Sequence, residues 1–407
     1  MKNSLKNIDK ILAEATGKNR IAGASVLVWQ GGKEQYYTQA GHADIAADSL
    51  LQRDTIFRIY SMTKPVTAAA VMLLFERGLL DIADPVREFL PGFANQHVST
   101  PDGPVPVKRE LTIKDLLGMT AGMPYPDDLN AETGRAVDTI FNEVDGSLRG
   151  PGGGNIGTVE FANRLGGCPL LFHPGEGWIY GTCSDVAAAI VEVVSGKRFG
   201  EFLHDEFFAP LGMVDTAFYV PSEKQHRLAR TYEESADGLI EYTDPRLGIQ
   251  NRMQSPPAFE SGGAGLASTI DDYLLFLRML LGKGALGNVR ILSEAAYDYF
   301  TTARISPMQQ QAKDIFCGGA SGYAYGNFLD VMTDCSQMTA FARKGEFIGA
   351  GWLGTHFFVS PADDLIFLYM TQSIRQSTTC YVRRCRNVVY AALSVKPSPS
   401  SSISSAR

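Results

Sequence analysis

The two ends of the chain carry hydrophobic patterns that predict strands of one sheet. Residues 23–41, "GASVLVWQGGKEQYYTQAG", hold an apolar β-branched run, a Gly-Gly pair and a second run, which is typical of a β-hairpin. Residues 355–373, "THFFVSPADDLIFLYMTQS", contain two more apolar runs of strand length. Helical patterns flank these segments at residues 1–20 and 380–394. We therefore expect the two ends to meet in one antiparallel sheet flanked by helices.

The middle of the chain has a different pattern, with helical periodicity interrupted by loops rich in Gly and Pro. The sequence thus predicts an α+β fold with a discontinuous α/β domain, residues 1–60 and 262–395, and a mostly helical domain, residues 61–261. A cleft between two such domains is the natural place for an active site. The Ser/Pro-rich tail, residues 396–407, is predicted to be disordered.

Composition narrows the possible partners. The chain has 407 residues, of which 45% are hydrophobic, and a net charge of -7, so nothing favours nucleic acid or an anionic membrane as partner. No apolar run reaches the length of a membrane span and the N-terminus lacks a signal-peptide core, so we expect a cytoplasmic protein. The histidines and cysteines lack metal-ligand spacing and the glycine-rich stretches lack phosphate-binding patterns, so no metal or cofactor is expected.

The stretch "RIYSMTKPVTAAAVMLLFERG" brings a serine and a lysine together at the start of a helix. Ser61 and Lys64 are three positions apart, so their side chains share one helix face, and Pro65 falls in the first turn, where it is tolerated. A serine hydroxyl needs a neighbouring base to act as a nucleophile, and a desolvated lysine can be that base. The alternative interpretation makes Ser61 a helix cap and Lys64 a solvated surface side chain.

A tyrosine further along the chain offers a third group for proton transfer. In "LLFHPGEGWIYGTCSDVAAAIVEVVSGK", Tyr180 lies in the loop before a helix predicted from about residue 185 to residue 194. A side chain in such a loop can face a cleft and protonate a leaving group. Packing in the core is the alternative for an isolated tyrosine.

Five segments occur in an order that resembles the serine β-lactamase-related superfamily, above all class C β-lactamases, family VIII carboxylesterases and related transesterases. They are "DTIFRIYSMTKPVTAAAVMLLFERGLLDIADPVREFLP", "LTIKDLLGMTAGMPY", "FHPGEGWIYGTCSDV", "GGAGLASTIDDYLLFLRMLL" and "GWLGTHFFVSPADDLIFLYMTQS". The similarity spans about residues 8 to 390. It implies a β-lactamase/penicillin-binding-protein-like fold in which Ser61 is acylated and Lys64 and Tyr180 form its proton network.

The resemblance also implies a third motif on an edge strand of the α/β domain, opposite the nucleophile. Counting back from "GTHFFVSP" places it at Gly349, Ala350 and Gly351. The oxyanion hole would then be formed by the backbone N–H groups of Ser61 and Trp352. An alternative register uses residues 352–354, but it breaks the ungapped match downstream.

Two departures from the superfamily pattern bear on the substrate. Gly349 stands where β-lactamases and peptidases carry a lysine, and Thr182 stands where the class C branch has an asparagine. Losing a cation and a carboxamide weakens the binding of a carboxylate and a peptide-like amide. We therefore expect hydrolysis of small carboxylic esters, with residues 349–352 and Thr182 in contact with the substrate.

Other functions remain open at this stage. The same acyl-enzyme could pass its acyl group to another acceptor, which would make the protein an acyltransferase. Weak β-lactamase or D-amino-peptide hydrolase activity is disfavoured by the two departures, and a catalytically inactive binding module is disfavoured by the intact Ser61, Lys64 and Tyr180. His356, close to the third motif, could face the cleft or pack in the sheet.

Overall fold

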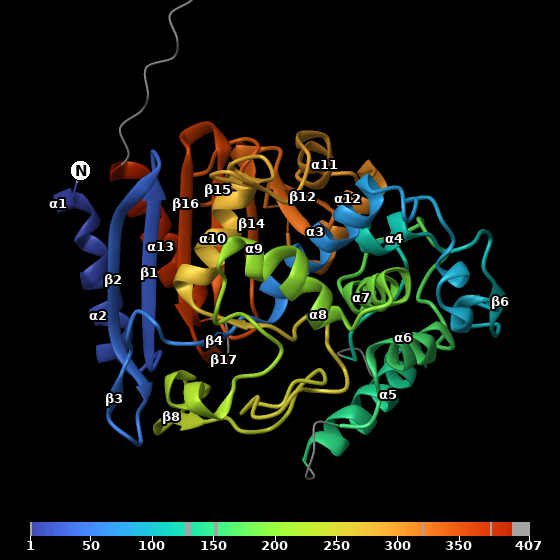
Figure 1. Cartoon of the computed structure of the whole chain (residues 1–407), viewed down its shortest axis with the longest axis horizontal. Helices are drawn as coiled ribbons and strands as arrows, with labels where there is room; N and C mark the ends of the chain where they lie inside the picture. The colour runs from blue at the N-terminus through green and yellow to red at the C-terminus, as the bar shows by residue number, and fades with distance from the viewer. Residues whose placement is uncertain (1, 127–131, 150–153, 320, 375–376, 393–407) are drawn as a thin grey trace, which may run out of the picture.

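The computed structural model describes residues 2–126, 132–149, 154–319, 321–374 and 377–392. Its main sheet is antiparallel, with the strand order β12-β13-β14-β15-β16-β1-β2-β3 (Figure 1). These strands are β1 Gly23–Gln30, β2 Lys33–Asp44, β3 Ser49–Leu50, β12 Tyr323–Gly326, β13 Leu329–Met332, β14 Phe347–Ala350, β15 His356–Ser360 and β16 Leu365–Thr371. The two ends of the chain meet where β1 pairs with β16, Leu27 lying opposite Leu368. The predicted antiparallel sheet is confirmed.

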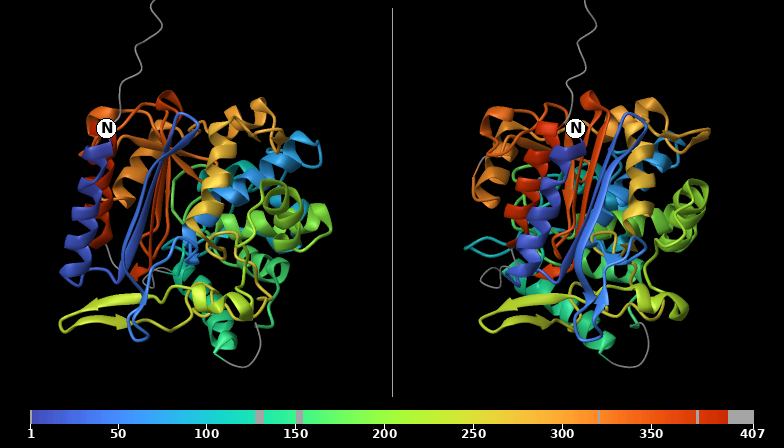
Figure 2. Two further views of the ribbon diagram at one scale, coloured as in Figure 1. Left: turned by 60° about the vertical axis from the view of Figure 1, so that its left-hand side comes forward. Right: turned by 90° about the vertical axis from the view of Figure 1, so that its left-hand side faces the viewer.

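Helices cover both faces of this sheet, as Figure 2 shows. The helices α2 Asn7–Gly17 and α13 Ser377–Ala392 lie on one face, and α10 Ile270–Leu281 lies on the other. Side chains alternate between the faces, so Val26 packs in the α2/α13 layer while Leu27 packs in the main core. Because both faces are covered, β16 is buried along its whole length, which explains its continuous apolar run.

The middle of the chain supplies a group of helices beside the sheet (Figure 1). They are α3 Thr63–Glu76, α4 Ile113–Gly118, α5 Glu132–Leu148, α6 Thr158–Gly166, α7 Cys183–Ser195, α8 Phe199–Leu203 and α9 Ala209–Leu211. The helix α3 packs against α7, and α6 packs on α7 in turn. The predicted domain boundaries at residues 61 and 262 stay a prediction, and the tail 396–407 lies outside the described residues.

Shorter elements complete the described chain. A small sheet has the order β17-β7-β8, with β17 Ser373–Ile374 parallel to β7 Tyr232–Ser235 and β8 Gly238–Glu241 antiparallel to β7. Through the pairing of β17 with β7, this small sheet joins the middle of the chain to the segment after β16. The remaining helices and strands are α1 Lys2–Leu5, α11 Glu294–Phe300, α12 Pro307–Phe316, β4 Phe57–Arg58, β5 His97–Val98, β6 Val105–Pro106, β9 Ala267–Ser268, β10 Ala285–Leu286 and β11 Val289–Arg290.

The prediction that the third motif lies on an edge strand is wrong. The strand that carries it, β14, is flanked by β15 on one side and by the β12–β13 hairpin on the other. The hairpin pairs with β14 only at Phe347 and Ile348, so Gly349 and Ala350 extend past it and keep one side open. The two hairpin strands have four residues each, too few for alternation to predict them.

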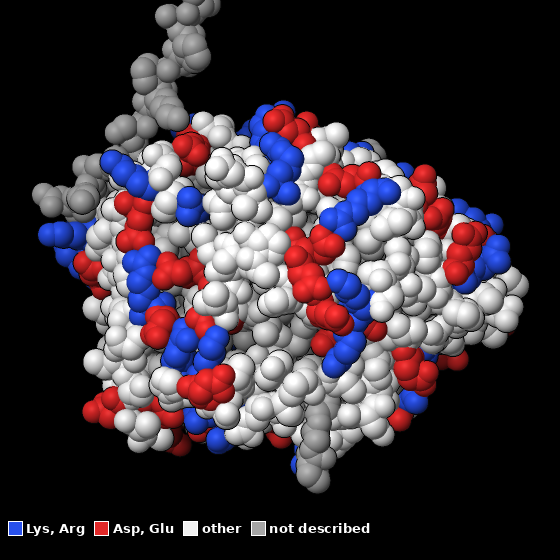
Figure 3. Space-filling model, in the orientation of Figure 1, with Lys and Arg blue, Asp and Glu red and all other residues white. Residues whose placement is uncertain are grey.

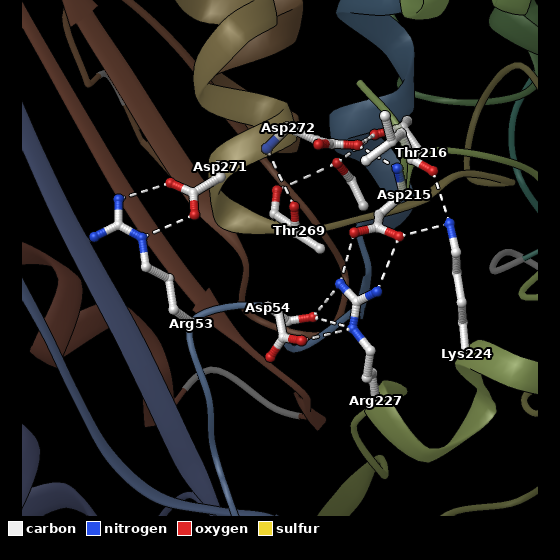
Figure 4. A network of polar contacts seen from close by, with 11 residues as sticks. Arg53, Asp54, Asp215, Thr216, Lys224, Arg227, Thr269, Asp271 and Asp272 are labelled. Atoms are coloured by element: carbon white, nitrogen blue, oxygen red, sulfur yellow. Dashed lines mark hydrogen bonds and ion pairs between the residues drawn. The ribbon is translucent and has the colours of Figure 1, made fainter. Parts of the chain in front are cut away.

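An ion-pair network joins the segment after α9 to the sheet side of the molecule (Figure 4). Arg227 binds both carboxylate oxygens of Asp215, at 3.0 and 2.6 Å, and donates to the backbone oxygen of Asp54 at 2.9 and 2.7 Å. Lys224 lies 2.8 Å from the same Asp215 carboxylate. Two hydrogen bonds to one carboxylate fix the position of the Arg227 side chain and also strengthen its ion pair with Asp215.

The network continues to the first turn of α10. Asp272 accepts hydrogen bonds from the backbone N–H of Asp215 at 2.7 Å and from the hydroxyl of Thr216 at 2.9 Å. The N–H of Asp272 in turn donates to the Thr269 hydroxyl at 3.1 Å, which caps α10. The helix that covers the sheet is thus anchored to the segment that follows α9.

The surface carries charges of both signs. On the face drawn in Figure 3, acidic and basic side chains are interspersed. Within the described residues no helix is both long enough and apolar enough to span a bilayer. The cytoplasmic location stays a prediction.

The network of Figure 4 yields a stability test. Arg227→Met should lower the free energy of unfolding by about 1–3 kcal/mol, because it leaves the mostly buried Asp215 carboxylate with fewer partners. Arg53→Met is the matched control, because Arg53 pairs with Asp271 at a solvent-exposed position, and it should cost about 1 kcal/mol or less. Urea unfolding measures both, and equal losses would contradict the anchoring role.

Candidate active site

The chain is fixed firmly just before Ser61. The strand β4 pairs with β9, and the N–H of Ile59 donates to the oxygen of Leu266 at 3.0 Å. Arg58 is buried and donates to the oxygen of Ala229 at 2.7 Å. Tyr60, also buried, has a φ of 41°, which a non-glycine residue adopts only at a cost in strain. The backbone is therefore held in an unfavourable conformation at the position directly preceding Ser61.

Lys64 is the centre of the site. It is only 1% exposed, and its Nζ donates to Ser61 Oγ at 3.1 Å, to the Tyr125 hydroxyl at 2.9 Å and to the oxygen of Gly263 at 2.8 Å. The interpretation of Lys64 as a solvated surface side chain is therefore wrong. Ser61 is half-buried in a 3-10 turn, residues 60–62, that leads into α3, so the spacing of three residues does place both groups together.

Sequence reasoning assigned no role to Tyr125, which makes the hydrogen bond to Lys64. Its hydroxyl is buried, and desolvation, followed by the nearby Asp185 charge, raises its pKa well above the ordinary value of a tyrosine. It therefore stays protonated at neutral pH. Its position at the end of "LTIKDLLGMTAGMPY", a segment that matches the superfamily, was the only signal pointing to it.

Tyr180 lies on the other side of the lysine. Its ring centroid is 4.7 Å from Lys64 Nζ and 5.9 Å from the ring of Tyr125. The two tyrosine loops are joined by backbone contacts, and a Cβ on Gly181 would lie 2.0 Å from the oxygen of Met123, so only glycine fits there. Half-buried Tyr180 thus reaches the lysine by its ring face, while Tyr125 reaches it by its hydroxyl.

A buried carboxylate holds the Gly263 segment, whose carbonyl oxygen accepts a hydrogen bond from Lys64. Asp185, on α7, accepts hydrogen bonds from the Ser261 hydroxyl at 2.6 Å and from the N–H of Gly263 at 3.0 Å. Burial raises the pKa of Asp185, while the Ser261 hydrogen bond and the charge of Lys64 oppose that rise. A Cβ on Gly263 would lie 2.6 Å from the Tyr125 hydroxyl, so this glycine is required for the close packing.

The third motif lies against the backbone that leads to Ser61. Gly349 and Ala350 end β14, and the N–H of Gly351 donates to the oxygen of Thr355 at 2.8 Å. A Cβ on Gly351 would lie 2.4 Å from the oxygen of Ile59, so glycine permits this approach. The ring of Trp352, the next residue, is 5.1 Å from the ring of Tyr60. The two backbone segments expected to form the oxyanion hole are therefore neighbours.

The sequence named two further candidate residues, Thr182 and His356. Thr182 is fully buried at the start of α7, and its hydroxyl has no hydrogen-bond partner among the described residues. Its contact with substrate stays a prediction. His356 lies opposite Tyr369 on the sheet face covered by α2 and α13, where burial, assisted by the charge of Arg386, lowers its pKa to about 3. It therefore packs in the sheet, on the face away from Lys64.

Comparison with known proteins places the chain in a family. The family model described as Beta-lactamase matches residues 8–378. The chain belongs to the beta-lactamase family. It is 29% identical over 381 residues to Esterase EstB of Burkholderia gladioli, a match that covers 90% of each protein. Members of this family thus include an esterase that aligns along nearly the whole chain.

Solved structures of two other proteins share the fold. EstCE1, described as a hydrolase with promiscuous acyltransferase activity, superposes with a TM-score of 0.79 and 25% identity, covering 96% of this chain and 99% of its own. A variant of simvastatin synthase from Aspergillus terreus gives a TM-score of 0.79 at 20% identity, covering 96% and 98%. The predicted β-lactamase-like α+β fold is confirmed.

The hydroxyl of Tyr125 offers a test of the lysine network. Tyr125→Phe removes one of the three partners of Lys64 Nζ, so labelling of Ser61 by a fluorophosphonate should slow by about tenfold or more. Tyr297→Phe, which changes the same side chain on α11 outside this network, should label at the native rate. Peptide mass spectrometry measures both, and equal rates would contradict a role for Tyr125 in activating Ser61.

Proposed function

We propose that the protein is a serine hydrolase that cleaves small carboxylic esters through an acyl-enzyme on Ser61. The observation that carries this proposal is the buried Lys64, whose Nζ lies 3.1 Å from Ser61 Oγ. A buried amine beside a serine hydroxyl is the arrangement needed to remove the proton of the nucleophile.

The partners of Lys64 favour its action as a base. An uncharged amine has two N–H groups and one lone pair. The carbonyl oxygen of Gly263 can only accept, so one N–H is directed there, and the second can be directed at the Tyr125 hydroxyl. The lone pair then faces Ser61 Oγ and can receive its proton as Oγ bonds to the ester carbonyl carbon.

The remaining steps follow from the neighbours of Ser61. The N–H groups of Ser61 and Trp352 would stabilise the tetrahedral oxyanion, a pair of donors worth about 3 kcal/mol each in similar sites. Tyr180, beside the lysine, would then protonate the departing alcohol. The proton that Lys64 took from Ser61 would replace the one that Tyr180 gives up. Water would then attack the acyl carbon, and its second hydrogen would return to Ser61 Oγ as the acid leaves.

The choice of esters over β-lactams rests on the third motif. A Cβ on Gly349 would lie 2.5 Å from the ring of Phe357, so a lysine at this position would collide with a buried aromatic side chain. The present packing of Phe357 thus disfavours the cation that the β-lactamase pattern places there, because its ring would have to shift. The similarity to Esterase EstB and to EstCE1 supports the same choice.

Hydrolysis should depend on Ser61 and prefer esters. The native protein should hydrolyse 4-nitrophenyl butyrate, and Ser61→Ala should lower kcat/KM by at least about 10³-fold, because no other group replaces the nucleophile. A chromogenic cephalosporin, measured in parallel, should react far more slowly than the ester. Faster turnover of the cephalosporin would overturn the assignment of an esterase.

Acyl transfer is the second candidate function, favoured by the acyltransferase activity named for EstCE1. Both functions share the acyl-enzyme and differ only in the acceptor that attacks it. Adding a primary alcohol to the ester assay distinguishes them. We expect free acid as the main product, and a transfer product that dominates at millimolar alcohol would instead identify an acyltransferase.

A further inference from the structure

A second cavity lies between α4, the end of α11 and the start of α12, three helices that are grouped on one side of the molecule (Figure 1). Its volume is about 670 Å³, which is within the range of small-molecule sites in proteins. The described residues that line it include neither Ser61 nor Lys64. The cavity is therefore a candidate for binding something other than the ester.

Several polar side chains of the lining already bind one another. Arg109 donates to both carboxylate oxygens of Asp115, at 2.6 and 2.7 Å, so these two charges offset each other. The side-chain amide of Gln309 donates to the oxygen of Gly175 at 2.8 Å and accepts from the N–H of Ser306 at 2.8 Å. These groups hold the walls of the cavity together.

Two cations of the lining are not used in this way. Lys114, on α4, is exposed, and its Nζ has no hydrogen-bond or ion-pair partner in the part of the chain that the structure describes. The guanidinium carbon of Arg304 lies 3.5 Å from the ring centroid of Tyr299, and its Nε donates to the oxygen of that residue at 3.3 Å. This contact orients the guanidinium, and its terminal N–H groups have no partner among the described residues.

The charge of the lining is positive. Its described residues hold three cations, Arg109, Lys114 and Arg304, and one carboxylate, Asp115, which leaves an excess of two positive charges. Nearby Asp81 and Asp84 do not line the cavity, and both accept hydrogen bonds from backbone N–H groups of their own turn, at 2.8 and 2.7 Å. A hollow lined by one sign of charge concentrates ions of the opposite sign.

The cavity wall is continuous with the loop that leads to Tyr180. The N–H of Gly175 donates to the oxygen of Thr120 at 2.9 Å, and the N–H of Ile179 donates to the oxygen of Met119 at 3.1 Å. Gly175 and Thr120 both line the cavity. A ligand held between α4 and α12 would therefore lie against a loop that ends at the candidate active site.

We propose that this cavity binds a small multivalent oxyanion, a molecule that carries a phosphate or several carboxylates, through Lys114 and Arg304. A guanidinium and an ammonium are the side chains that bind such oxygens with charge-assisted hydrogen bonds. The proposal is independent of the esterase assignment, because it concerns a different set of residues.

Calorimetric titration of the native protein with inorganic phosphate and with citrate tests this site at low ionic strength. At least one of the two probes should bind saturably, and the one that binds shows whether phosphate or carboxylate groups are preferred. The double variant Lys114→Gln, Arg304→Gln should weaken that binding by about tenfold or more, because both charge-assisted contacts are lost. Failure of both probes to bind would overturn the proposal.

The double variant Lys33→Gln, Arg252→Gln is the matched control. It removes the same two charges from exposed positions that do not line the cavity, so its affinity should equal that of the native protein. Equal weakening in both double variants would show that the net charge alone attracts the anion, and would overturn the site. Added salt should weaken native binding, because the contacts are ionic.

Hydrogen exchange measured by mass spectrometry locates the site without any substitution. The probe that binds should slow amide exchange in peptides covering residues 109–120 and 299–309, whereas residues 33–44 of β2 should exchange at an unchanged rate. Protection confined to other segments would contradict the placement. Neither measurement involves ester turnover, so a failure here leaves the proposed hydrolase function standing, and a failure of hydrolysis leaves this site standing.

Discussion

The structure depends on the hydrogen bonds of one buried amine, the Nζ of Lys64, which has been removed from water. An amine in a dry interior is tolerated only when each of its polar hydrogens has an acceptor. The partners here come from three segments: Ser61 in the turn before α3, Tyr125 in the loop after α4, and Gly263 in the glycine-rich stretch after the helical region. The hydrogen bonds of Lys64 therefore fix these segments relative to one another, and Ser61 is placed as a result.

The close approaches around the lysine explain where the site needs glycine. At Gly263 a side chain would displace the Tyr125 hydroxyl, and at Gly351 it would push the third motif away from Ile59. Both positions bring two backbones, or a backbone and the Tyr125 hydroxyl, closer than a Cβ allows. Asp185 then holds the Gly263 segment in place through the N–H of that residue. The geometry of the candidate site is thus set by small residues as much as by Ser61, Lys64 and the tyrosines.

Local patterns were enough to predict part of this structure. The strands at the two ends and the pairing of Ser61 with Lys64 follow from alternation and helical spacing, which act over a few residues. Tyr125 could not be predicted in this way, because its contact with Lys64 depends on how distant loops pack. The same holds for the β12–β13 hairpin, whose strands are too short to show a period and whose presence moves β14 from the edge into the sheet.

The pairing of β1 with β16 has a consequence for the order in which the molecule forms. During synthesis β1 and β2 can pair as soon as they emerge, but the other edge of β1 stays open until Leu365–Thr371 has been made. At about 5–20 residues per second, an apolar strand edge is exposed for tens of seconds in the growing chain. The third motif is also synthesised late, so the helical region and its lysine can fold well before the site becomes complete. A ribosome-bound fragment that ends before β14 would contain Ser61 and Lys64 without the third motif, which completes the proposed site.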